Sequence, residues 1–587
     1  MSNTDTAYQN QNRGSQSDYD FYFAGMDVTM RQKLAFTTAH FLLKPGAVIA
    51  DMGCGSGLGS YQFAQLNPEV QVIGIDINPE TVRIAREKYQ LPNLRFEIGD
   101  VENPDPELGP FDGILNSSVL HHVYTFSGEN KYDKFHVENA VRNQFDSLKT
   151  GGMMIIRDFV AMPDDKFVFL DVKAKSDKHE ESDADLLWRF SRTARPLADH
   201  TGPGFYLQEV SSEDPEWRRF HLAAKWANEF ILRKDYRESW DVEILEEYSW
   251  WKAEEYRREL AALGGRVVYT APFWNSWIVD NRYRGNIRLF EENGTPMDFP
   301  PTQYIAVVEK VGPDVSLTLN EQTPLQEAPA YLKFSSHENA DTGEVFDLIA
   351  RPGEVTDCLP YWQENERLFV LARHGYPRPL SNIVPRSTPV LDEKYWSGHM
   401  VEPIAIAEGR GDESLSFRER LSHRSGLDHS DLMLETPGLS YYPSPGMADE
   451  LVKTALVPLA QPEPDYVWSM PARFSGLSDS GEVRAYAAQD LLRASQVGIL
   501  PEARLEMNIY DLMRRAGITP EAWLGDALPP LATGDILLED LDGLLSRPPE
   551  QSYRPSEKKA GYLRHIRSEF TDRARHGKRL AATPLEF

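Results

Sequence analysis

The sequence predicts an α/β protein whose first half forms a doubly wound, mostly parallel sheet, followed by a second unit of α+β type. Three observations predict this arrangement. Apolar strands alternate with amphipathic helices up to about residue 160, a glycine-rich turn follows the first strand, and aspartates end the first strands in turn.

The alternation defines the elements of the first unit in order. A helix is expected over 27–43, and the next helices over 59–67 and 79–90, the last with Pro79 in its first turn. The expected strands are "AVIADM" (47–52), "VQVIGIDI" (70–77), "LRFEIGD" (94–100), "FDGILNSS" (111–118) and "GGMMIIRDFV" (151–160). The rhythm returns later with a helix over 250–265 and strands over 266–273 and 302–311.

Between these two stretches the pattern breaks. Residues 164–248 are charged, and eight of the twelve tryptophans lie between Trp188 and Trp277. In "EWRRFHLAAKWANEFILRKD" the apolar residues Trp217, Phe220, Ala224 and Ile231 fit one face of a helix. We therefore expect a Trp-rich helical insertion that covers a binding crevice at the carboxyl ends of the strands. The alternative is an extra helical pair that only packs against the sheet.

The remaining chain divides into further parts. Residues 1–17 are expected to be a disordered tail, 18–312 the first domain, and 330–520 a strand-rich unit with helices in "SFRERLSHRSG" and "EVRAYAAQDLLRASQVG". Residues 521–587 form a C-terminal extension with a basic helix, because 552–580 hold nine Lys/Arg against three Asp/Glu. Such a segment most often docks onto an acidic surface of its own protein, and a nucleic-acid or partner arm is the alternative.

Composition excludes several classes of protein. A net charge of −28 argues against broad binding to nucleic acid or anionic membranes, since both require a positive surface. Two cysteines are too few for a disulfide framework or a structural zinc site, so no metal is expected. No apolar run is long enough to span a bilayer, and we expect a soluble cytoplasmic protein without a membrane partner.

The turn "DMGCGSGLGS" (51–60) raises the question of which nucleotide it would bind. A dinucleotide fingerprint needs G-x-G-x-x-G, but the third glycine would fall on Leu58 or Ser60. Asp51, two residues before the first glycine, would repel a pyrophosphate and could pair with a cationic amino group. The turn by itself leaves the choice between a dinucleotide and an adenosyl cofactor without phosphates to the rest of the chain.

Aspartates close the following strands. Asp76 ends the second strand, where a carboxylate accepts hydrogen bonds from both ribose hydroxyls. Asp100 ends the third strand, and its carboxylate with the amide of Val101 suits an adenine edge. Asn116 and Ser117 end the fourth strand, where a methionine moiety would lie. Three acidic strand ends in successive units predict one adenosine site.

These motifs identify a resemblance. "DMGCGSG", "GIDINPE", "GDVENPD", "FDGILNSSVLHHV" and "LKTGGMMIIRDFV" resemble, in order and spacing, the class I S-adenosylmethionine-dependent methyltransferases, which have a Rossmann-like fold. The resemblance covers residues 20–312 and implies S-adenosyl-L-methionine as cofactor. It implies that the cofactor contacts Asp51, Gly53, Cys54, Gly55, Gly57, Asp76, Ile77, Asp100, Val101 and Asn116.

Candidates for catalysis are fewer. Methyl transfer mainly requires alignment of the acceptor and exclusion of water, and a general base helps only some acceptors. His121, His122 and Asp158 follow the fourth and fifth strands and are the candidates for that role, although "VLHHV" is also a common packing feature of the family. The "NPPY" signature of enzymes that methylate exocyclic amino groups is replaced by "NSSV", which argues against adenine methylation.

Residues 330–520 resemble the Nudix fold, in particular ADP-ribose pyrophosphatases. The resemblance rests on "RLFVLARHGYPRPL", "VEPIAIAEG", "RERLSHRSGL", "YYPSPGMADELVKTALVPL" and "AQDLLRASQVGILPEARLEMNIYDLM". Aligned on Gly426 and Leu427, the family's two metal-binding glutamates become His423 and Arg424, and its Arg-Glu pair becomes Glu419 and Arg420. An arginine in place of a divalent cation predicts a catalytically inactive domain, unless Glu408, Glu413, Glu419 and Glu450 rebuild a metal site. The domain would then serve as scaffold or as a substrate-recognition module in which Arg424 pairs with a phosphate.

The sequence thus predicts an S-adenosylmethionine-dependent methyltransferase of a small-molecule or nucleotide-linked acceptor. Two alternatives stay open: methylation of RNA, DNA or protein with the basic tail as docking arm, and a non-catalytic cofactor-binding scaffold in a larger assembly. Nucleic acid is possible but not the favoured partner, and the acceptor atom and the oligomeric state are not determined by the sequence.

Overall fold

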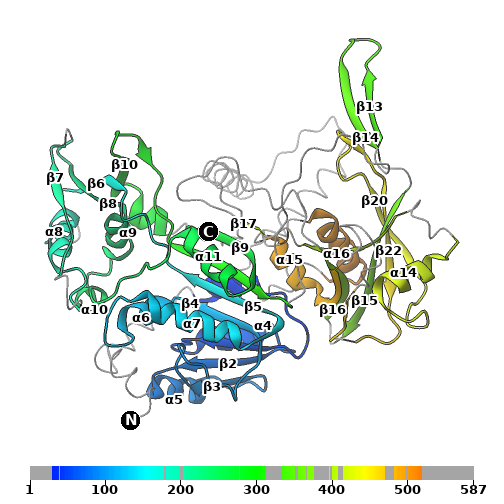
Figure 1. The fold of residues 1–587 in the computed structure, drawn as a ribbon, viewed down its shortest axis with the longest axis horizontal. Helices are drawn as coiled ribbons and strands as arrows, with labels where there is room; N and C mark the ends of the chain where they lie inside the picture. The colour runs from blue at the N-terminus through cyan, green and yellow to red at the C-terminus, as the bar shows by residue number, and fades with distance from the viewer. Residues whose placement is uncertain are drawn as a thin grey trace.

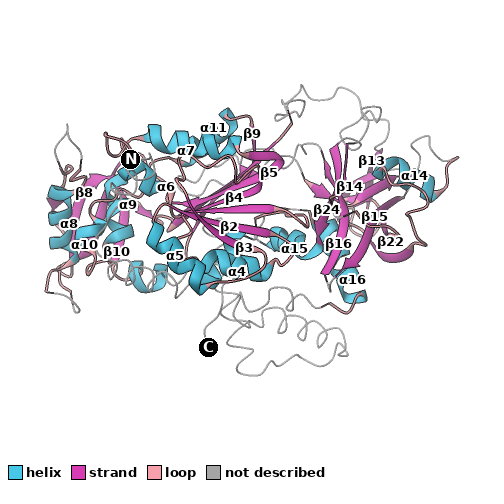
Figure 2. Ribbon diagram, turned by 90° about the horizontal axis from the view of Figure 1, so that it is seen from below, coloured by secondary structure: helices cyan, strands magenta, loops and turns pink. Residues whose placement is uncertain are grey.

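The computed structural model of the chain describes residues 30–38, 40–176, 180–197, 203–212, 214–275, 278–312, 333–350, 354–364, 367–375, 395–396, 400–407, 414–463, 465–469, 481–496, 500 and 502–518. Three parts follow one another in space. A small sheet and the C-terminal unit lie at opposite ends of the molecule, and the large sheet of the first domain lies between them in both views (Figures 1 and 2). In the described residues, no helix has the length and apolarity that crossing a membrane requires.

The central sheet has the order β17-β9-β12-β5-β4-β1-β2-β3. Its strands are β1 (Val48–Met52), β2 (Gln71–Asp76), β3 (Leu94–Ile98), β4 (Phe111–Ser117), β5 (Leu148–Asp158), β9 (Gly265–Phe273), β12 (Gln303–Lys310) and β17 (Tyr395–Trp396). Strands β1 to β5 are parallel, and β12 is antiparallel to both β5 and β9. This is the doubly wound α/β fold predicted from the alternation.

Helices cover both faces of this sheet (Figure 2). Helices α3 (Met30–Thr38) and α4 (Leu58–Leu66) are followed along the chain by α5 (Pro79–Lys88), α6 (Leu120–Phe126), α7 (Lys134–Asp146) and α11 (Ala253–Ala262). The α4 side chains pack with Ile49 and Ile155 on one face, whereas α7 and α11 pack with Met154 and Ile156 on the other. Alternate residues of β5 therefore enter two separate cores, as a strand buried on both faces requires.

The insertion after β5 is not the helical cap that the sequence predicted. It is an antiparallel five-stranded sheet of order β11-β10-β6-β8-β7 with helices beside it, which we call the cap. Its elements are β6 (Phe167–Lys173), α8 (Asp183–Thr193), β7 (Gln208–Val210), β8 (Trp217–Ala223), α9 (Ala224–Arg233), α10 (Trp240–Glu243), a short π-helix η1 (Val279–Tyr283), β10 (Ile287–Glu291) and β11 (Pro296–Met297). The cap thus draws on residues 278–297 as well as 164–248.

The stretch expected as one helix changes structure at residue 224. Phe220 and Leu222 alternate with more exposed residues on β8, which pairs with β6, and the helix α9 begins only at Ala224. The same correction applies to "EVRAYAAQDLLRASQVG", whose first residues form β24 before α15 begins at Ala488. In both segments pairing with a neighbouring strand overrides an apolar spacing that also fits a helix.

The C-terminal unit has α+β architecture, as expected. A sheet of order β20-β22-β15-β16-β24-β23, with β18 and β19 attached, is packed against helices, and a hairpin extends from it (Figure 1). The elements are β13 (Lys333–Glu338), β14 (Val345–Ala350), β15 (Val355–Glu364), β16 (Arg367–Gly375), β18 (Val401–Glu402), β19 (Ile404–Ala407), α14 (Phe417–Ser425), β20 (Thr436–Tyr441), β21 (Ala448–Asp449), β22 (Val452–Pro458), β23 (Val467–Ser469), β24 (Gly481–Ala487), α15 (Ala488–Gln496) and α16 (Ala503–Arg515). The tails 1–17 and 521–587 lie outside the described residues.

A buried ion cluster joins the C-terminal unit to the central sheet. Glu309 on β12 pairs with Arg266 on β9 and with Arg484 on β24 (3.0 Å), and His374 on β16 lies 3.4 Å from the same carboxylate. Burial by itself would raise the pKa of Glu309, but these cations hold it below its ordinary value. Together with the β17–β9 pairing, this cluster fixes the C-terminal unit to the far edge of the sheet.

Candidate active site

The turn after β1 requires glycine. Gly53 and Gly57 have φ values of +68° and +80°, and a Cβ on Gly53 would lie 2.3 Å from Val119 Cγ2. The backbone N–H of Gly55, with φ +52°, donates to Asp76 Oδ2 at 2.9 Å. The turn therefore brings its backbone against the end of β2, and a side chain in it would fill this space.

Asp51 and Asp76 meet at the carboxyl ends of β1 and β2. Asp51 is buried and accepts a hydrogen bond from Ser60 Oγ at 2.6 Å. Burial raises its pKa to about 6, and the neighbouring Asp76 carboxylate adds to that shift. Burial also raises the pKa of Asp76, although the backbone amides of Asn78, Gly55 and Ile77 oppose this. Two carboxylates close together in a buried site favour a cationic or hydrogen-bond-donating ligand.

The other predicted cofactor residues lie along the same edge. Asp100 follows β3, where Gly99 N donates to the Asp76 carbonyl, and its carboxylate accepts from Glu102 N (2.9 Å) and Asn103 Nδ2 (3.1 Å). Val101 is buried, and its carbonyl accepts from Gln144 Nε2. Three predicted residues remain. Cys54 is buried and carries a free thiol, and Ile77, directly after β2, is half-buried. Asn116 is buried and donates from Nδ2 to Gln144 Oε1 at 2.6 Å, while its Oδ1 has no partner among the described residues.

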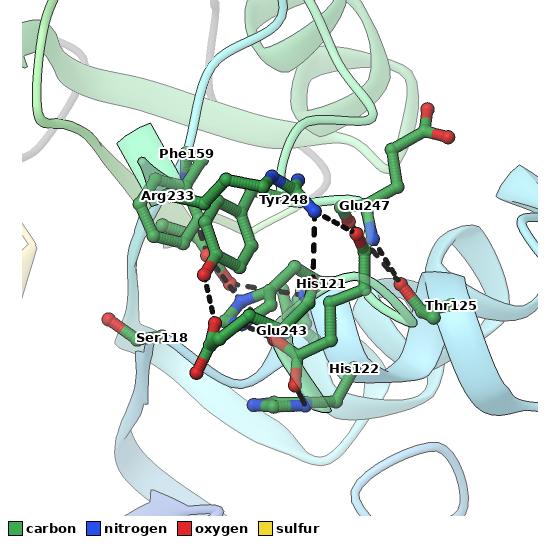
Figure 3. A network of polar contacts seen from close by, with 12 residues as sticks. Ser118, His121, His122, Thr125, Phe159, Arg233, Glu243, Glu247 and Tyr248 are labelled. Atoms are coloured by element: carbon green, nitrogen blue, oxygen red, sulfur yellow. Dashed lines mark hydrogen bonds and ion pairs between the residues drawn. The ribbon is translucent and has the colours of Figure 1, made fainter. Parts of the chain in front are cut away.

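His121 and Asp158 form a buried pair, and Figure 3 shows His121 among the labelled side chains Tyr248, Glu243 and His122. His121 Nδ1 lies 2.8 Å from Asp158 Oδ1, and its Nε2 lies 3.5 Å from Glu246 Oε2. Burial would lower the pKa of His121, but Asp158 and Glu246 outweigh it and raise this pKa to about 9. His121 is therefore a cation at neutral pH, and a protonated imidazole cannot accept the proton of an acceptor group.

Asp158 has a structural task that occupies its carboxylate. Oδ2 accepts from the backbone amides of Leu120 (2.9 Å) and His121 (3.3 Å), and Oδ1 accepts from the amide of Phe159 (3.0 Å). The side chain is fully buried. Asp158 thus holds the first turn of α6 against the end of β5, as an acidic group at a helix N-terminus does.

His122 is the more accessible histidine of the pair. Its side chain is 16% exposed, its ring stacks on Phe126, and Nδ1 lies 3.8 Å from Glu246 Oε1. His121, His122 and Glu246 are the one group of histidine, cysteine and acidic side chains in the described chain whose donor atoms come close enough for a metal ion. Because both ring nitrogens of His121 already face carboxylates, we interpret this group as an ion-pair cluster.

Buried charges of the segment 243–249 were not anticipated from the sequence. Glu229 accepts hydrogen bonds from the backbone amides of Tyr248 and Ser249 and forms an ion pair with Arg233. The ring of Tyr248 stacks on Phe159 with centroids 4.7 Å apart (Figure 3). The glutamate that precedes Tyr248 is equally enclosed: Glu247 contacts Lys225 Nζ (2.5 Å), Arg195 Nε (3.1 Å) and Tyr124 OH (3.1 Å). These contacts hold residues 243–249, which we call the return segment of the cap, in place over α6. Apart from the i,i+4 pair of Glu229 and Arg233, the partners lie 19 to 123 residues apart in the chain, so no local motif signals them.

A comparison with known proteins shows which family the residues around this edge of the sheet resemble. The family described as "Methyltransferase domain" matches residues 43–192, from β1 through most of α8. The chain contains a methyltransferase domain. Its α/β fold and its cofactor, S-adenosyl-L-methionine, are those that the sequence predicted.

Curated relatives match over shorter stretches. Trans-aconitate 2-methyltransferase of Deinococcus radiodurans is 38% identical over 77 residues, which are 13% of this chain and 28% of the relative. Phosphoethanolamine N-methyltransferase of Triticum aestivum is 31% identical over 133 residues, 22% of this chain and 24% of the relative. The chain thus spans about a quarter of the length of these relatives.

Solved structures resemble the chain at low identity. An O-methyltransferase family 2 protein from Planctomyces limnophilus, in complex with apigenin, has 18% identity and a TM-score of 0.28, and the match covers 51% of this chain and 63% of the other. The putative methyltransferase in complex with the Haloferax volcanii Trm112 activator has 13% identity and a TM-score of 0.28, with 51% and 100% covered.

The residues of the methyltransferase domain fit the cofactor. The glycine turn leaves space that a Cβ would occupy, and the buried Asp51 has a raised pKa that a neighbouring ammonium group would lower. The Asp76 carboxylate accepts one hydrogen bond from Gly55 N and one from Asn78 N. A carboxylate can accept about four hydrogen bonds, so Asp76 has acceptor capacity left for the cofactor.

The C-terminal unit places its Nudix-like residues as follows. Glu419 caps the N-terminus of α14 by accepting from Ser416 N at 2.7 Å, and Arg424 is buried on the same helix. Glu408 and Glu413 lie outside the described residues, and Glu450 belongs to no metal-binding group among those described. A cavity beside the end of α14 is lined by the acidic residues Asp428, Asp431 and Glu463, and these would repel a phosphate.

Proposed function

We propose that this protein is an S-adenosylmethionine-dependent methyltransferase whose acceptor is a small molecule or a nucleotide-linked metabolite. The observation that carries the proposal is the meeting of Asp51 and Asp76 beside the glycine turn, at the carboxyl edge of the sheet. The names of two relatives support a small acceptor, since they act on trans-aconitate and phosphoethanolamine. The enclosed segment 243–249 above α6 also suits a bounded acceptor.

Each residue has a proposed task. Bound S-adenosyl-L-methionine supplies an activated methyl group. Asp76 accepts the ribose hydroxyls, Asp51 pairs with the ammonium of the methionine end, and Asp100 with Val101 contacts the adenine. The turn residues Gly53, Cys54, Gly55 and Gly57, together with Ile77 and Asn116, line this site.

The acceptor side is organised by the cap. Glu229 and Glu247 hold the return segment in place and thereby exclude water from the reacting groups. Asp158 and His121 position α6, and His122 is the histidine that can accept a proton when the acceptor is a hydroxyl. For acceptors that lose no proton, alignment alone suffices.

We propose that the C-terminal unit is an inactive Nudix-like scaffold. The helix that would carry the metal-binding glutamates has Glu419 engaged in its own cap and Arg424 buried. The strand β17 adds to the edge of the methyltransferase sheet beside β9, and Arg484 on β24 of the C-terminal sheet pairs with Glu309 on β12. The unit thus supports the edge formed by β9 and β12.

The test is uptake of label from methyl-labelled cofactor by fractionated cell extract. We expect uptake in a small-molecule fraction by the wild type, loss of uptake in Asp76→Ala, and no change in the matched variant Asp105→Ala, an exposed turn aspartate. Uptake only in the RNA, DNA or protein fractions would contradict the small acceptor. Cofactor binding without uptake in any fraction would favour the scaffold role instead.

A further inference from the structure

A buried arginine stands next to Asp158 at the carboxyl edge of the methyltransferase sheet. Arg157 is the last but one residue of β5, and it is 6% exposed. Its register partners are Ser117 on β4 and Ile305 on β12. Because successive residues of a strand point to opposite faces, Arg157 lies on the face opposite to Asp158.

No carboxylate of the described residues pairs with Arg157. Its Nη1 lies 3.5 Å from Ser118 Oγ, at the limit of a hydrogen bond, and its Nε has no partner. Burial lowers its pKa to about 9, and Asp158 opposes this only in part. Four other buried arginines differ, since each pairs with a carboxylate: Arg233, Arg266, Arg373 and Arg493. A buried guanidinium without a counter-ion is costly to the folded protein and calls for a ligand.

An unsatisfied acceptor lies beside this donor. Gln303, the first residue of β12, donates from Nε2 to Ser118 Oγ at 3.0 Å, while its buried Oε1 has no hydrogen-bond partner within the described part of the chain. Ser118 has a φ of +59°, a left-handed conformation that is uncommon for serine, and its hydroxyl thereby meets both Gln303 and Arg157. Three side chains, from the residue after β4, from β5 and from β12, thus converge with both donor and acceptor capacity unused.

The position of this cluster suits the acceptor. In the sheet order β12-β5-β4-β1-β2-β3, the carboxylates of the proposed cofactor site belong to β1, β2 and β3. Arg157, Ser118 and Gln303 occupy the adjoining half of the same edge, next to Asn116 on β4. A molecule bound there lies beside the methionine end of the cofactor.

We propose that Arg157, with Ser118 and Gln303, binds an oxyanion of the methyl acceptor, either a carboxylate or a phosphate. The inference rests on the proposed function and specifies its substrate class. The planar guanidinium forms paired hydrogen bonds with such groups, and the charge of the anion neutralises the buried cation. Gln303 Oε1 accepts a hydrogen bond from a hydroxyl or amino group next to the oxyanion. Arg157 is thus a specificity-determining residue for an anionic acceptor in an otherwise acidic protein.

The first experiment measures binding in the protein saturated with S-adenosylhomocysteine. Inorganic phosphate forms one arm and citrate the other, with glycerol as uncharged control, at constant ionic strength. We expect one of the two anions to bind in calorimetry and to raise the Tm, and glycerol to do neither. Phosphate binding identifies a phosphate acceptor, and citrate binding identifies a carboxylate acceptor.

Substitutions locate the site. Arg157→Met and Arg157→Gln should weaken anion binding by about 10- to 100-fold, and Arg157→Lys should restore part of it. Arg83→Gln, which removes an exposed arginine paired with Glu80 and Glu87, should bind like the wild type. Without anion, Arg157→Met should unfold at the same or a higher Tm, because an apolar side chain replaces an unpaired buried cation. A merely structural arginine would lower the Tm instead.

The outcomes separate this inference from the proposed function. If S-adenosylhomocysteine does not bind the wild type, the proposed function fails and the inference fails with it. If it binds but neither anion does, or if Arg157→Met binds the anion as tightly as the wild type, only the inference is overturned. A lowered Tm of anion-free Arg157→Met also overturns it.

Discussion

The ion pair between His121 and its two carboxylates makes the stability of the methyltransferase domain depend on pH. The perturbation is a rise in pH, which removes the proton that Asp158 and Glu246 share with this buried ring. The folded-state pKa is about 9, against an ordinary value of 6.5. Because this pKa is raised in the folded state, the stabilisation is complete below pH 6.5 and is lost as the pH rises through 9.

The magnitude follows from the shift. A difference of about 2.5 pKa units at 1.36 kcal/mol each gives about 3 kcal/mol of stability. Between these two pH values the free energy of unfolding should fall by about 1.4 kcal/mol per pH unit from this group. The side chain is 4% exposed, so solvent screening reduces the value little.

The assay is urea unfolding followed by tryptophan fluorescence from pH 6 to pH 10. The wild type should lose stability over this range, and His121→Gln, which does not titrate, should be less stable at pH 6 and show a flatter profile. His221→Gln is the matched control, because its partner Glu292 is 61% exposed and screened by solvent. Parallel profiles of the wild type and His121→Gln would refute the reasoning.

Three further predictions concern other groups. In calorimetry, the affinity for the cofactor should be about tenfold higher at pH 7 than at pH 5, because the pKa of Asp51, about 6, must fall when an ammonium group binds. The variant Asp51→Asn should bind the cofactor more weakly and show no such pH dependence. Glu309→Gln should destabilise the junction of the two units by about 3–5 kcal/mol, because it leaves the buried Arg266 without its carboxylate, whereas Arg484 keeps Glu482. The loss should be seen as a lower Tm and faster proteolysis of the C-terminal unit. Treatment with EDTA should leave methyl transfer unchanged, and a loss restored by a divalent ion would show that His122 and its neighbours hold a metal.

The position of the three aspartates at one edge of the sheet could be predicted from the sequence because its signals are local, and their contact with the cofactor stays a prediction. Asp51, Asp76 and Asp100 each stand at the end of a strand that an apolar run in the sequence predicts. The parallel pairing of β1, β2 and β3 then brings these strand ends together. Gly53 is a local signal of the same kind, because a tight turn needs a residue in the left-handed conformation and glycine adopts it readily.

The acceptor side could not be predicted in this way. Glu246 approaches His121 from 125 residues further along the chain, and Gln303 reaches Ser118 from 185 residues away. The fold of the cap was missed for a related reason, because Phe220 fits a helix face equally well until β6 pairs with its strand. The alternation of Phe220 and Leu222 was the one signal that could have indicated β8.

The proposed function requires that an adenosine binds at the carboxyl ends of β1, β2 and β3, and calorimetric titration with S-adenosylhomocysteine tests this directly. The wild type should bind one equivalent, and Asp76→Ala should lose about 1–3 kcal/mol of binding free energy because a buried acceptor of the ribose hydroxyls is gone. No binding by the wild type, or equal affinity of Asp76→Ala, would contradict it.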